Sequence, residues 1–495
     1  MNKNDTPLKH PDRIFVGGSW IEPSTDAKLP VIMPSTEQLF LEVAEAQPAD
    51  VDRAVEAART AFDTGPWPRM SHAERAVYLD AIADEILRRK PELIDMWVSE
   101  VGTTISIVPS MVDVAAYRFR YYAELSKSFP FRERHAGGSG AFDAYLVREP
   151  VGVVAAILPW NGPIVMGAGK AAAALIAGCS VVMKASPEAP GGVYMLSEII
   201  ESVGLPAGVF NMIAADRAAS EHLVRHTGVD KVTFTGSSAA GKRVGSICGE
   251  RLARVTLELG GKSPGIVLDD YDLEKVAKSI AVSAPMNTGQ ACNSLTRIIV
   301  SQPRHDALVE AMAAEFAKIR VGDPFAPASR MGPLTMARQR DRVESYVAKG
   351  VAEGAVLATG GRRPAHLNRG YYIEPTLFAN VDNNMTIARE EIFGPVVSVI
   401  PARDEAHAIV LANDTEFGLN ASIFTDDMDR FWKVAAQVRS GTVGHNGYRA
   451  SGSIALGGYK QSGVGREGGA EGLHSFLETK VVMLDADIPA EVLSA

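Results

Sequence analysis

A single cysteine lies in a polar, glycine-bearing segment where its thiol can meet a substrate. Residues 287–294 read NTGQACNS, and the hydrophobic stretch RIIVS follows at 297–301. The other two cysteines, Cys179 in IAGCSVVM and Cys248 in VGSICGE, have the apolar neighbours typical of a thiol that serves only packing. Cys292 is therefore the candidate for chemistry. A free thiol has a pKa of about 8.5 and reacts as the thiolate, so we expect a local device that favours the thiolate of Cys292.

Three other segments place polar or aromatic groups in turns. ILPWNGP puts Trp160 and Asn161 in a proline-bounded loop after a predicted strand. TLELGGKSP puts Glu258 before paired glycines at a strand end, and EEIFGPV puts Glu391 and Phe393 before a Gly-Pro turn. Each segment alone also has a structural interpretation, because an asparagine can cap a turn, a strand-end carboxylate can be solvated and a phenylalanine can belong to the core. Their significance depends on the fold that carries them.

The elements that carry these residues alternate between strand and helix from residue 150 onward. Predicted strands lie at 151–159, 180–186, 208–214, 231–237 and 254–260, with predicted helices between them. A second series of the same kind begins near residue 261. Such alternation predicts α/β domains with mostly parallel, doubly wound sheets. Before this region, 49–63 and 71–90 have the spacing of amphipathic helices.

Composition narrows the class of protein. The chain has 495 residues, which predicts two or three domains. A net charge of −9 and a pI near 5.7 argue against nucleic acid as a main partner. Three cysteines cannot form a disulfide framework, which indicates a reducing compartment. The N-terminal residues lack the apolar run of a signal peptide, and no apolar stretch approaches the ~20 residues that span a bilayer, so we expect a cytoplasmic protein without membrane contact.

One apparent nucleotide-binding motif is misleading. GAGKAA at 167–172 fits the pattern G-x-G-x-x-A, but WNGPIVM separates it from the preceding strand, whereas the fingerprint needs its first glycine directly after a strand. We interpret 167–172 as part of an alanine-rich helix. A better phosphate site is VTFTGSSAAG, where Gly236 and Ser237 open a helix whose backbone N–H groups can hold a pyrophosphate. Glycine and serine also occur at such turns for steric and capping reasons.

The motifs PWN, ELGGK, GQAC and E-x-F-G-P, at these separations, resemble those of the aldehyde dehydrogenase superfamily. The resemblance extends from about residue 13 to residue 484 and implies an NAD(P)-dependent, non-acylating enzyme. The implied fold is α/β, with two doubly wound parallel-sheet domains and a small β arm for oligomerisation. The implied nucleotide-binding domain comprises 1–126 and 150–260, the catalytic domain 261–465, and the arm 127–149 with the C-terminal strand in 466–495. A homodimer or homotetramer is the implied assembly.

The resemblance also implies the role of each residue. Cys292 is the nucleophile, Glu258 the general base and Asn161 a donor to the oxyanion, and no metal is implied. Thiolate attack on an aldehyde gives a thiohemiacetal, hydride transfer to NAD or NADP gives a thioester, and water activated by Glu258 hydrolyses it. Of the two cofactors NAD is slightly favoured. The residues implied to bind the cofactor are Ile157, Leu158, Pro159, Trp160, Lys184, Ser186, Glu188, Gly236, Ser237, Leu259, Gly260, Glu391 and Phe393.

Two departures from the family pattern concern the cofactor. Relatives often carry a glutamate three residues after the adenine-ribose lysine, where its carboxylate binds the ribose hydroxyls and repels a 2′-phosphate. This chain has Pro187 at that position after Lys184, and Glu188 one residue later. We therefore expect NADP to be accepted beside NAD unless Glu188 compensates. The glycine-containing turn that often follows GVFN is also replaced, by AADR at 214–217.

A third departure concerns the substrate. The family's P-W-N-F-P stands as PWNGP, so Gly162 replaces a phenylalanine, and Gly169 and Leu456 replace aromatic residues often found in relatives. We expect a wide tunnel suited to a bulky apolar or aromatic aldehyde, with Met166 as an adaptable wall. The alternative is that the glycines only let two helices approach. The predicted pocket residues are Gly162, Met166, Gly169, Ala291, Asn293 and Leu456.

Three other functions fit parts of the sequence. A relative that passes the acyl group to coenzyme A is disfavoured by Glu258, since transfer to a thiol needs no water-activating base. A cofactor-independent cysteine hydrolase would need a histidine, and His445 is the least unsuitable of ten. A structural protein on a retired dehydrogenase fold is disfavoured because Cys292, Glu258 and Asn161 are all present. The physiological aldehyde stays open.

Overall fold

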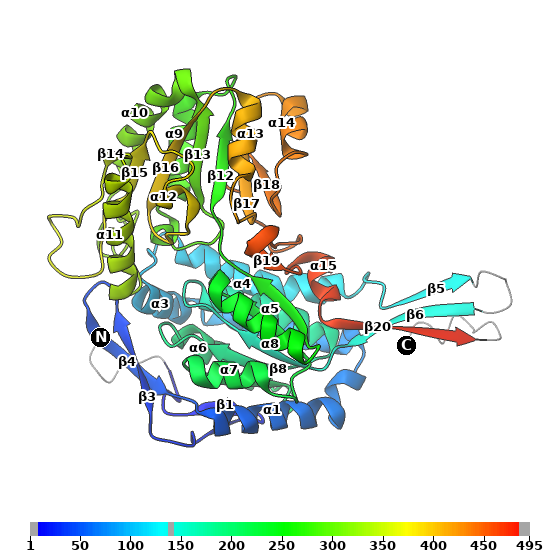
Figure 1. The fold of residues 1–495 in the computed structure, drawn as a ribbon. Helices are drawn as coiled ribbons and strands as arrows, with labels where there is room; N and C mark the ends of the chain where they lie inside the picture. Colours follow the sequence, from blue (N-terminus) through cyan, green and yellow to red (C-terminus); the bar gives the residue numbers. More distant parts are fainter. Residues whose placement is uncertain (1–7, 137–142, 485–495) are drawn as a thin grey trace.

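The computed structural model describes residues 8–136 and 143–484. Two α/β bodies lie one above the other, and three strands project from the side of the lower body (Figure 1). A sheet forms the centre of each body, and helices cover both of its faces. This architecture confirms the predicted α/β fold with two doubly wound sheets and a small β unit.

The first sheet is the centre of the lower body. Its strands are β1 (Ile14–Val16), β2 (Ser19–Ile21), β7 (Val153–Ile157), β8 (Ser180–Ala185), β9 (Phe210–Ala214), β10 (Lys231–Thr235), β11 (Arg254–Glu258) and β19 (Gly463–Val464). Their order is β19-β11-β10-β7-β8-β9-β1-β2, and the five central strands are parallel. The strand order reverses between β7 and β10. Doubly wound folds bind ligands at the carboxyl ends of the strands at such a switch point.

Helices cover both faces of the first sheet because alternate residues of each strand point to opposite sides. In β7, Val154 and Ala156 join one core, whereas Val153 and Ala155 join the other. One face is covered by α2 (His72–Arg88), α3 (Lys90–Val101), α4 (Val108–Leu125), α5 (Pro163–Ala177) and α6 (Gly191–Val203), and the other by α1 (Pro48–Asp63), α7 (Arg217–Arg225) and α8 (Ser238–Glu250). The misleading GAGKAA segment lies within α5, which confirms its interpretation as helix.

The second sheet is the centre of the upper body. Its strands are β12 (Ser263–Val267), β13 (Leu295–Ser301), β14 (Val356–Thr359), β15 (Thr376–Ala379), β16 (Val396–Ala402), β17 (Asn420–Phe424) and β18 (Thr442–His445). Their order is β14-β15-β16-β13-β12-β17-β18, and only β14 is antiparallel to its neighbour. The helices on this sheet are α9 (Leu273–Ser283), α10 (His305–Phe316), α11 (Ala337–Ala352), α12 (Thr386–Arg389), α13 (Glu405–Asn413) and α14 (Met428–Ala435).

Two small antiparallel sheets complete the described strands. β3 (Lys28–Met33) pairs with β4 (Gln38–Ala44), and β6 (Asp143–Pro150) pairs with both β5 (Arg132–Ala136) and β20 (Leu477–Leu484), which follows α15 (Gly469–His474). The three-stranded sheet projects from the body (Figure 1) and joins the two segments predicted for the arm. The predicted arm also includes 137–142 and 485–495, which lie outside the described residues. β19 lies in the first sheet, although its residues fall within the range 261–465 predicted for the catalytic domain.

The chain passes from the first sheet to the second through a pair of glycines. β11 ends at Glu258 and β12 begins at Ser263, so the carboxyl edge of the first sheet faces the amino edge of the second. Cys292 precedes β13, and a Cβ atom on Gly261 would lie 2.3 Å from the carbonyl oxygen of Cys292. Any side chain at position 261 would therefore force the two edges apart, so only glycine permits this approach.

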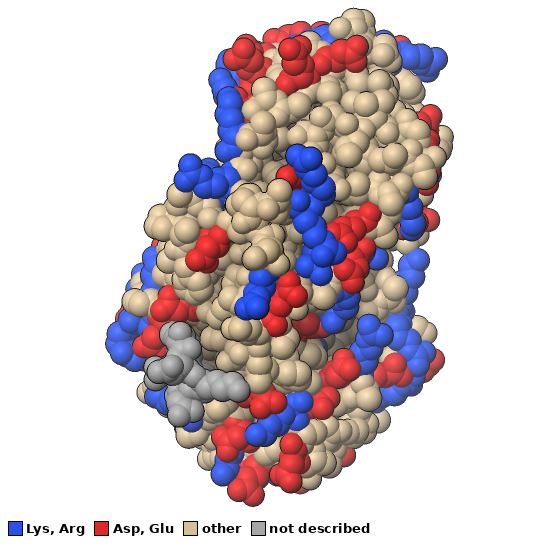
Figure 2. All heavy atoms as spheres, turned by 90° about the vertical axis from the view of Figure 1, so that its left-hand side faces the viewer, with Lys and Arg blue, Asp and Glu red and all other residues tan. Residues whose placement is uncertain are grey.

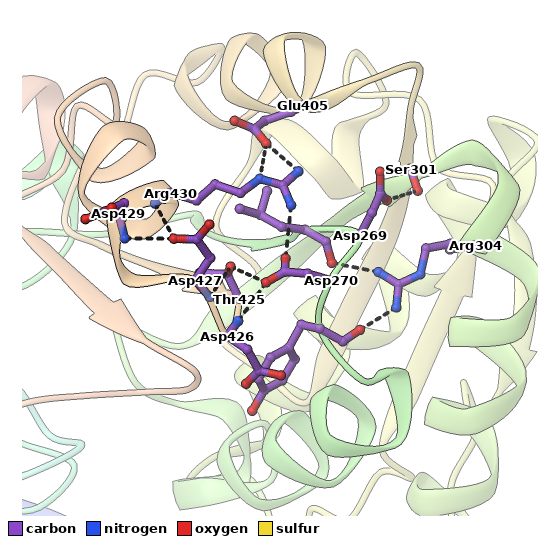
Figure 3. Close-up of polar contacts among 12 residues, drawn as sticks. Asp269, Asp270, Ser301, Arg304, Glu405, Thr425, Asp426, Asp427, Asp429 and Arg430 are labelled. Atoms are coloured by element: carbon purple, nitrogen blue, oxygen red, sulfur yellow. Dashed lines mark hydrogen bonds and ion pairs between the residues drawn. The ribbon is translucent and has the colours of Figure 1, made fainter.

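The opposite, carboxyl edge of the second sheet holds a dense set of charged groups (Figure 3). Asp270 accepts hydrogen bonds from the Thr425 hydroxyl at 2.6 Å and from the Asp426 N–H at 2.8 Å. Arg430 pairs with Asp270 at 3.1 Å and with Glu405 at 2.6 Å. Within the described parts of the chain, no group of His, Cys, Asp and Glu side chains could hold a metal ion. These hydrogen bonds and ion pairs connect the ends of β12 and β17 with α13 and α14.

The surface carries charge of both signs. On the face shown in Figure 2, Lys and Arg side chains lie among Asp and Glu side chains, and the longest run of basic groups, near the centre, has acidic groups beside it. None of the helices in the described residues has the length and apolar composition that crossing a bilayer requires. A cytoplasmic location stays a prediction.

A buried ion pair joins the start of α3 to α6 and gives a test of the fold. Nη1 of Arg89 donates to Oε2 of Glu198 at 2.7 Å, and the two side chains are 5% and 0% exposed. Arg89→Met leaves the Glu198 carboxylate buried without its charge partner, which typically costs about 3–5 kcal/mol. We expect a lower midpoint of thermal unfolding. The control is Arg88→Met, whose parent side chain is 66% exposed. Equal shifts for both variants would contradict the prediction.

Candidate active site

Two cavities meet where the first sheet reverses its strand order. The thiol cavity has a volume of 530 Å³ and is lined by Cys292, Glu258 and Asn161, so the three predicted catalytic residues border one space. The Lys184 cavity has a volume of 550 Å³ and is lined by Lys184, among other residues that follow the parallel strands. The residues common to both cavities are Pro159, Trp160, Arg217, Thr235, Gly236 and Ser237.

A strained backbone places Cys292 in the thiol cavity. Asn287, Thr288 and Gly289 all have left-handed conformations, with φ of 50°, 56° and 72°. A β-branched residue rarely adopts such a φ, and the Thr288 hydroxyl is held by hydrogen bonds of 3.1 Å to two carbonyl groups of a neighbouring loop. A Cβ atom on Gly289 would lie 2.3 Å from the carbonyl carbon of Gly394. Neighbouring segments therefore hold the loop in a conformation that it would not keep alone.

The same loop fixes the amide of Asn161. Nδ2 of Asn161 donates to the Gln290 carbonyl at 2.9 Å, and Nδ2 of Asn287 donates to the Asn161 carbonyl at 2.9 Å. The Asn161 side chain therefore lies beside the Cys292 loop. Its amide nitrogen has a second hydrogen, and with the Cys292 backbone N–H it can offer two donors to an oxygen atom in the thiol cavity.

The environment of Cys292 disfavours its thiolate. Burial raises the pKa of Cys292 to about 12, and the carboxyl groups of Glu391 and Glu258 add to this effect. These neighbours therefore favour the protonated thiol, whereas the sequence led us to expect a group that favours the thiolate. Cys179 and Cys248 are buried, whereas Cys292 is half-buried and borders a cavity. The surroundings of Cys292 therefore differ from those of the other two thiols, as the sequence predicted.

Glu258 is a buried carboxyl group with a free oxygen atom. It is 6% exposed, and its Oε1 has no hydrogen-bond partner among the described residues. Burial raises the pKa of Glu258 well above its ordinary value, and Glu467 adds to the increase, whereas Lys170 opposes it. Lys170 and Glu467 form a buried ion pair, and the Thr233 hydroxyl donates to Oε1 of Glu467 at 3.0 Å. Glu258 thus lies in a buried environment close to the ion pair of Lys170 and Glu467.

Glu391 and Phe393 form another wall of the thiol cavity. The Gly261 N–H donates to Oε1 of Glu391 at 3.1 Å, and burial raises the pKa of Glu391 to about 7. Phe393 has a left-handed φ of 62°, which Gln339 of α11 supports by donating to the Phe393 carbonyl at 2.7 Å. The rings of Phe393 and Trp160 meet edge to face, with centroids 5.4 Å apart. α11 therefore positions this wall.

The Lys184 cavity holds a buried lysine and a fixed carboxylate. Burial lowers the pKa of Lys184 to about 8, and Glu188 opposes this decrease. The carboxylate of Glu188 is bound by the Ser186 hydroxyl and by Arg338 of α11. Burial alone would raise the pKa of Glu188, but these hydrogen bonds lower it below its ordinary value, so the group is ionised at neutral pH. Pro187 lines the same cavity.

The turn between β10 and α8 borders both cavities. Gly236 and Ser237 lie there, and the Ser237 side chain caps α8 by accepting from the Ala240 N–H at 3.3 Å. The capping and the phosphate-site interpretations of this turn are therefore compatible. Four other residues predicted to bind the cofactor also line one of the cavities, namely Ile157, Leu158, Leu259 and Gly260.

The predicted substrate residues of α5 share one face of the helix. Gly162 precedes α5, and Met166 and Gly169 follow at spacings of four and three residues. Met166 lines the thiol cavity. A Cβ atom on Gly162 would lie in ordinary van der Waals contact with Met166 at 3.8 Å and with Trp97 at 4.0 Å, so a small side chain fits there without a clash. A Cβ atom on Gly169 would lie 2.0 Å from Nη1 of Arg118, so a guanidinium group already occupies that place.

The other predicted substrate residues lie near the thiol or on the C-terminal segment. Ala291 and Asn293 flank Cys292 in the chain. Tyr448 is close by: burial raises its pKa to about 12, Cys292 adds to this, and a hydrogen bond with the Asn293 side chain opposes it. The backbone of Leu456 exchanges two hydrogen bonds, of 2.6 and 2.8 Å, with that of residue 467.

Several residues of the site carry no short motif and were missed in the sequence. Arg338 and Arg342 line the thiol cavity from one face of α11, and only their spacing of four residues could have signalled this. No such signal marked three residues that lie next to the site without lining either cavity, namely Lys170 near Glu258, Tyr448 near Cys292 and Arg118 beside Gly169. None of the described histidines lines either cavity. The histidine least unsuitable for a hydrolase, that of β18, instead bonds to a backbone carbonyl at 2.9 Å.

Comparisons with known proteins identify the family and agree with the fold. The sequence model of the Aldehyde dehydrogenase family matches residues 20–482. A geranial dehydrogenase of Castellaniella defragrans is 40% identical over 472 residues, which cover 95% of this chain and 98% of the relative. The crystal structure of a Mycobacterium tuberculosis aldehyde dehydrogenase complexed with NAD+ is 41% identical, with a TM-score of 0.93 and coverage of 96% of this chain and 99% of that chain. 

A betaine aldehyde dehydrogenase of Staphylococcus aureus in complex with NAD+ is also similar. It is 34% identical, with a TM-score of 0.94 and coverage of 97% of this chain and 96% of that chain. The family match and the relatives extend over nearly the whole length of the chain. This chain belongs to the aldehyde dehydrogenase family.

Proposed function

We propose that the chain oxidises an aldehyde to the carboxylic acid, with hydride transfer to NAD, through a covalent intermediate on Cys292. The observation that carries this proposal is the thiol cavity, where Cys292, the unpartnered Oε1 of Glu258 and the amide of Asn161 border one space. A nucleophile, a base and an oxyanion donor are the groups that a carbonyl substrate needs to pass through a tetrahedral adduct and an acyl intermediate.

The two joined cavities fit a dinucleotide cofactor. Two buried polar atoms that border them, Oγ1 of Thr235 and Oε1 of Glu258, have no partner in the described structure. Lys184 would hold the adenine ribose, the start of α8 the pyrophosphate and Glu391 the nicotinamide ribose. When bound, NAD or NADP accepts a hydride. Complexes of NAD+ with two of the similar enzymes support this assignment.

The first step assigned to this chain forms a bond between Sγ of Cys292 and the aldehyde carbon. The thiol proton passes to solvent water, and the carbonyl oxygen gains negative charge. Nδ2 of Asn161 and the Cys292 N–H stabilise that charge, and one such donor is typically worth about 3–4 kcal/mol of the barrier. Loss of hydride from the adduct carbon then restores its C=O bond and leaves a thioester on Cys292.

The second step hydrolyses the thioester. Glu258 takes a proton from the attacking water, and the hydroxide adds to the thioester carbon. The C–S bond then breaks with its electron pair going to the sulfur, Glu258 returns the proton to the sulfur, and the carboxylic acid is released. The raised pKa of Glu258 makes it a stronger base than an ordinary carboxylate. An enzyme that passed the acyl group to coenzyme A would not need this base. A cofactor-independent cysteine hydrolase would need a histidine, and no described histidine borders the thiol cavity.

We infer that the substrate has a bulky, largely apolar or aromatic body. The absence of a side chain at Gly162 and the adaptable wall of Met166 support this inference. The similarity to a geranial dehydrogenase is consistent with an extended apolar chain. Betaine aldehyde, named for another relative, carries a positive charge, and the cationic Arg118 beside Gly169 disfavours a charge of the same sign.

We also propose a homodimer or homotetramer in which the projecting sheet contacts a second copy. β20 is an edge strand of this sheet, since its one described partner is β6. Val481 and Met483 of β20 are 55% and 66% exposed. An edge strand with exposed apolar side chains readily pairs with another chain.

Replacing the thiol tests the nucleophile. Cys292→Ala should reduce aldehyde oxidation and any esterase activity to the level of a contamination control, because no other group can form the adduct. NAD binding, measured by calorimetry, should persist because the Lys184 cavity is unchanged. Cys248→Ala, at a buried thiol away from the cavities, is the control and should keep wild-type activity. Measurable aldehyde oxidation by purified Cys292→Ala would contradict the assignment.

Glu258→Gln tests the base. Hydride transfer precedes the attack by water, so we expect a burst of reduced cofactor followed by turnover about 10²–10⁴-fold slower than that of the wild type. Mass spectrometry should detect the thioester on Cys292. Glu250→Gln removes a carboxyl group that is 65% exposed and should behave as the wild type. Normal steady-state turnover of Glu258→Gln would mean that another group activates the water.

Glu188→Gln tests cofactor choice. The ionised Glu188 lies in the Lys184 cavity and repels a 2′-phosphate, so we expect the wild type to prefer NAD over NADP. The amide removes this repulsion and should raise kcat/KM for NADP relative to NAD by roughly 5- to 10-fold. Glu344→Gln, which alters a carboxylate paired with Arg363 elsewhere, is the control. An unchanged ratio in Glu188→Gln would remove Glu188 from the determinants of cofactor choice.

A further inference from the structure

Arg118 lies beside Gly169, on the helix face whose Met166 lines the thiol cavity. It belongs to α4, and Gly162, Met166 and Gly169 share the facing side of α5. Met166 borders the cavity itself. Nη1 of Arg118 fills the place of the side chain that Gly169 lacks, since a Cβ atom there would lie 2.0 Å away. The absence of a side chain at Gly169 therefore leaves room for the guanidinium group of Arg118.

The other side of Arg118 faces the C-terminal segment of the site. A Cβ atom on Gly452 would lie 3.4 Å from Nε of Arg118. Gly452 follows Tyr448, whose hydroxyl is close enough to Cys292 for the two pKa values to interact. The guanidinium group thus lies between two segments that both extend to the thiol, one through Met166 and one through Tyr448.

The guanidinium group has a donor without an acceptor. Its Nε is buried and has no hydrogen-bond partner in the described structure. Burial lowers the pKa of Arg118, and Glu467 and Tyr122 are the acidic groups that oppose this decrease. The carboxylate of Glu467 is already bound by Lys170 and Thr233. A planar cation with a free donor in a half-buried place is suited to a carboxylate, which it can bind through two parallel hydrogen bonds.

We propose that Arg118 binds a carboxylate at the far end of the substrate, so that the preferred aldehydes also carry a carboxyl group. This inference rests on the proposed oxidation at Cys292 and adds the chemistry of the distal end. α5 rises about 10 Å between Gly162 and Gly169, at about 1.5 Å per residue, which sets the approximate span between the two ends. Met166 lies between them, so an apolar chain or an aromatic ring connects aldehyde and carboxylate.

A purely structural role for Arg118 makes a different prediction. If the guanidinium group only balanced the charge of Glu467, its removal would alter the turnover of every aldehyde by a similar factor. If it binds the substrate, the change depends on whether the aldehyde carries a carboxylate. The ratio of kcat/KM for an aldehyde with a carboxylate to kcat/KM for a neutral aldehyde therefore distinguishes substrate binding from a structural role.

Matched substrate pairs provide the test. We would compare ω-oxo acids of about six to about ten carbons, a range chosen for the span along α5, with their methyl esters. The para-carboxybenzaldehyde and para-tolualdehyde pair supplies the aromatic case. The wild type should favour each acid over its neutral partner by about 10- to 100-fold in kcat/KM. Arg118→Met should remove this preference, mainly through KM, and change kcat/KM for the neutral aldehydes by less than about 3-fold. Arg118→Lys should restore part of it, since it keeps the charge without the planar fork.

Two further variants make the result decisive. Arg120→Met alters an exposed arginine of the same helix, paired with Asp84 at 2.6 Å, and should leave the ratio unchanged. Gly169→Ala displaces the guanidinium group without removing it and should give the same selective loss even if Arg118→Met fails to fold. Equal kcat/KM for acid and ester in the wild type, or a ratio that neither variant moves, overturns the proposal. Turnover of the esters would then still support aldehyde oxidation, whereas no turnover of any aldehyde would overturn the proposed function.

Discussion

The contact between two backbones, at Gly261 and Cys292, is the constraint on which the rest of the site depends. A Cβ atom on Gly261 would lie 2.3 Å from the Cys292 carbonyl oxygen, so nothing larger than hydrogen fits. The contact lets the carboxyl edge of one sheet touch the amino edge of the other. The first sheet brings Glu258 at the end of β11 and the turns around both cavities, and the second brings the loop with the thiol. Neither domain holds the site alone.

The exclusion of water at this contact explains the electrostatics of the site. Cys292, Glu258 and Glu391 border one cavity, and burial raises the pKa of each. The carboxyl groups of Glu391 and Glu258 also disfavour the Cys292 thiolate, which adds to the effect of burial. The buried pair of Lys170 and Glu467 is the counterpart, because its charges stay fixed by mutual contact. When ionisable groups interact in this way, the gain or loss of a proton by one of them changes the pKa of its neighbours.

The sequence predicted what local chemistry and element order determine. The alternating strands and helices predicted two doubly wound sheets, the distance from the preceding strand identified GAGKAA as helix, and the polar setting of Cys292 separated it from the other thiols. It could not predict contacts between residues far apart in the chain. Arg118 reaches the place left by Gly169 from a different helix, and the partner of Glu188 comes from α11, 150 residues later. The pKa of Cys292 likewise depends on burial, which no motif encodes.

The high pKa of the resting thiol also bears on the chemical durability of the protein. Oxidation of cysteine to sulfenic acid proceeds through the thiolate and follows its abundance and exposure. With a pKa raised to about 12, nearly all Cys292 side chains are protonated at neutral pH. The thiol on which the proposed reaction depends is therefore poorly reactive towards peroxide while the site is idle.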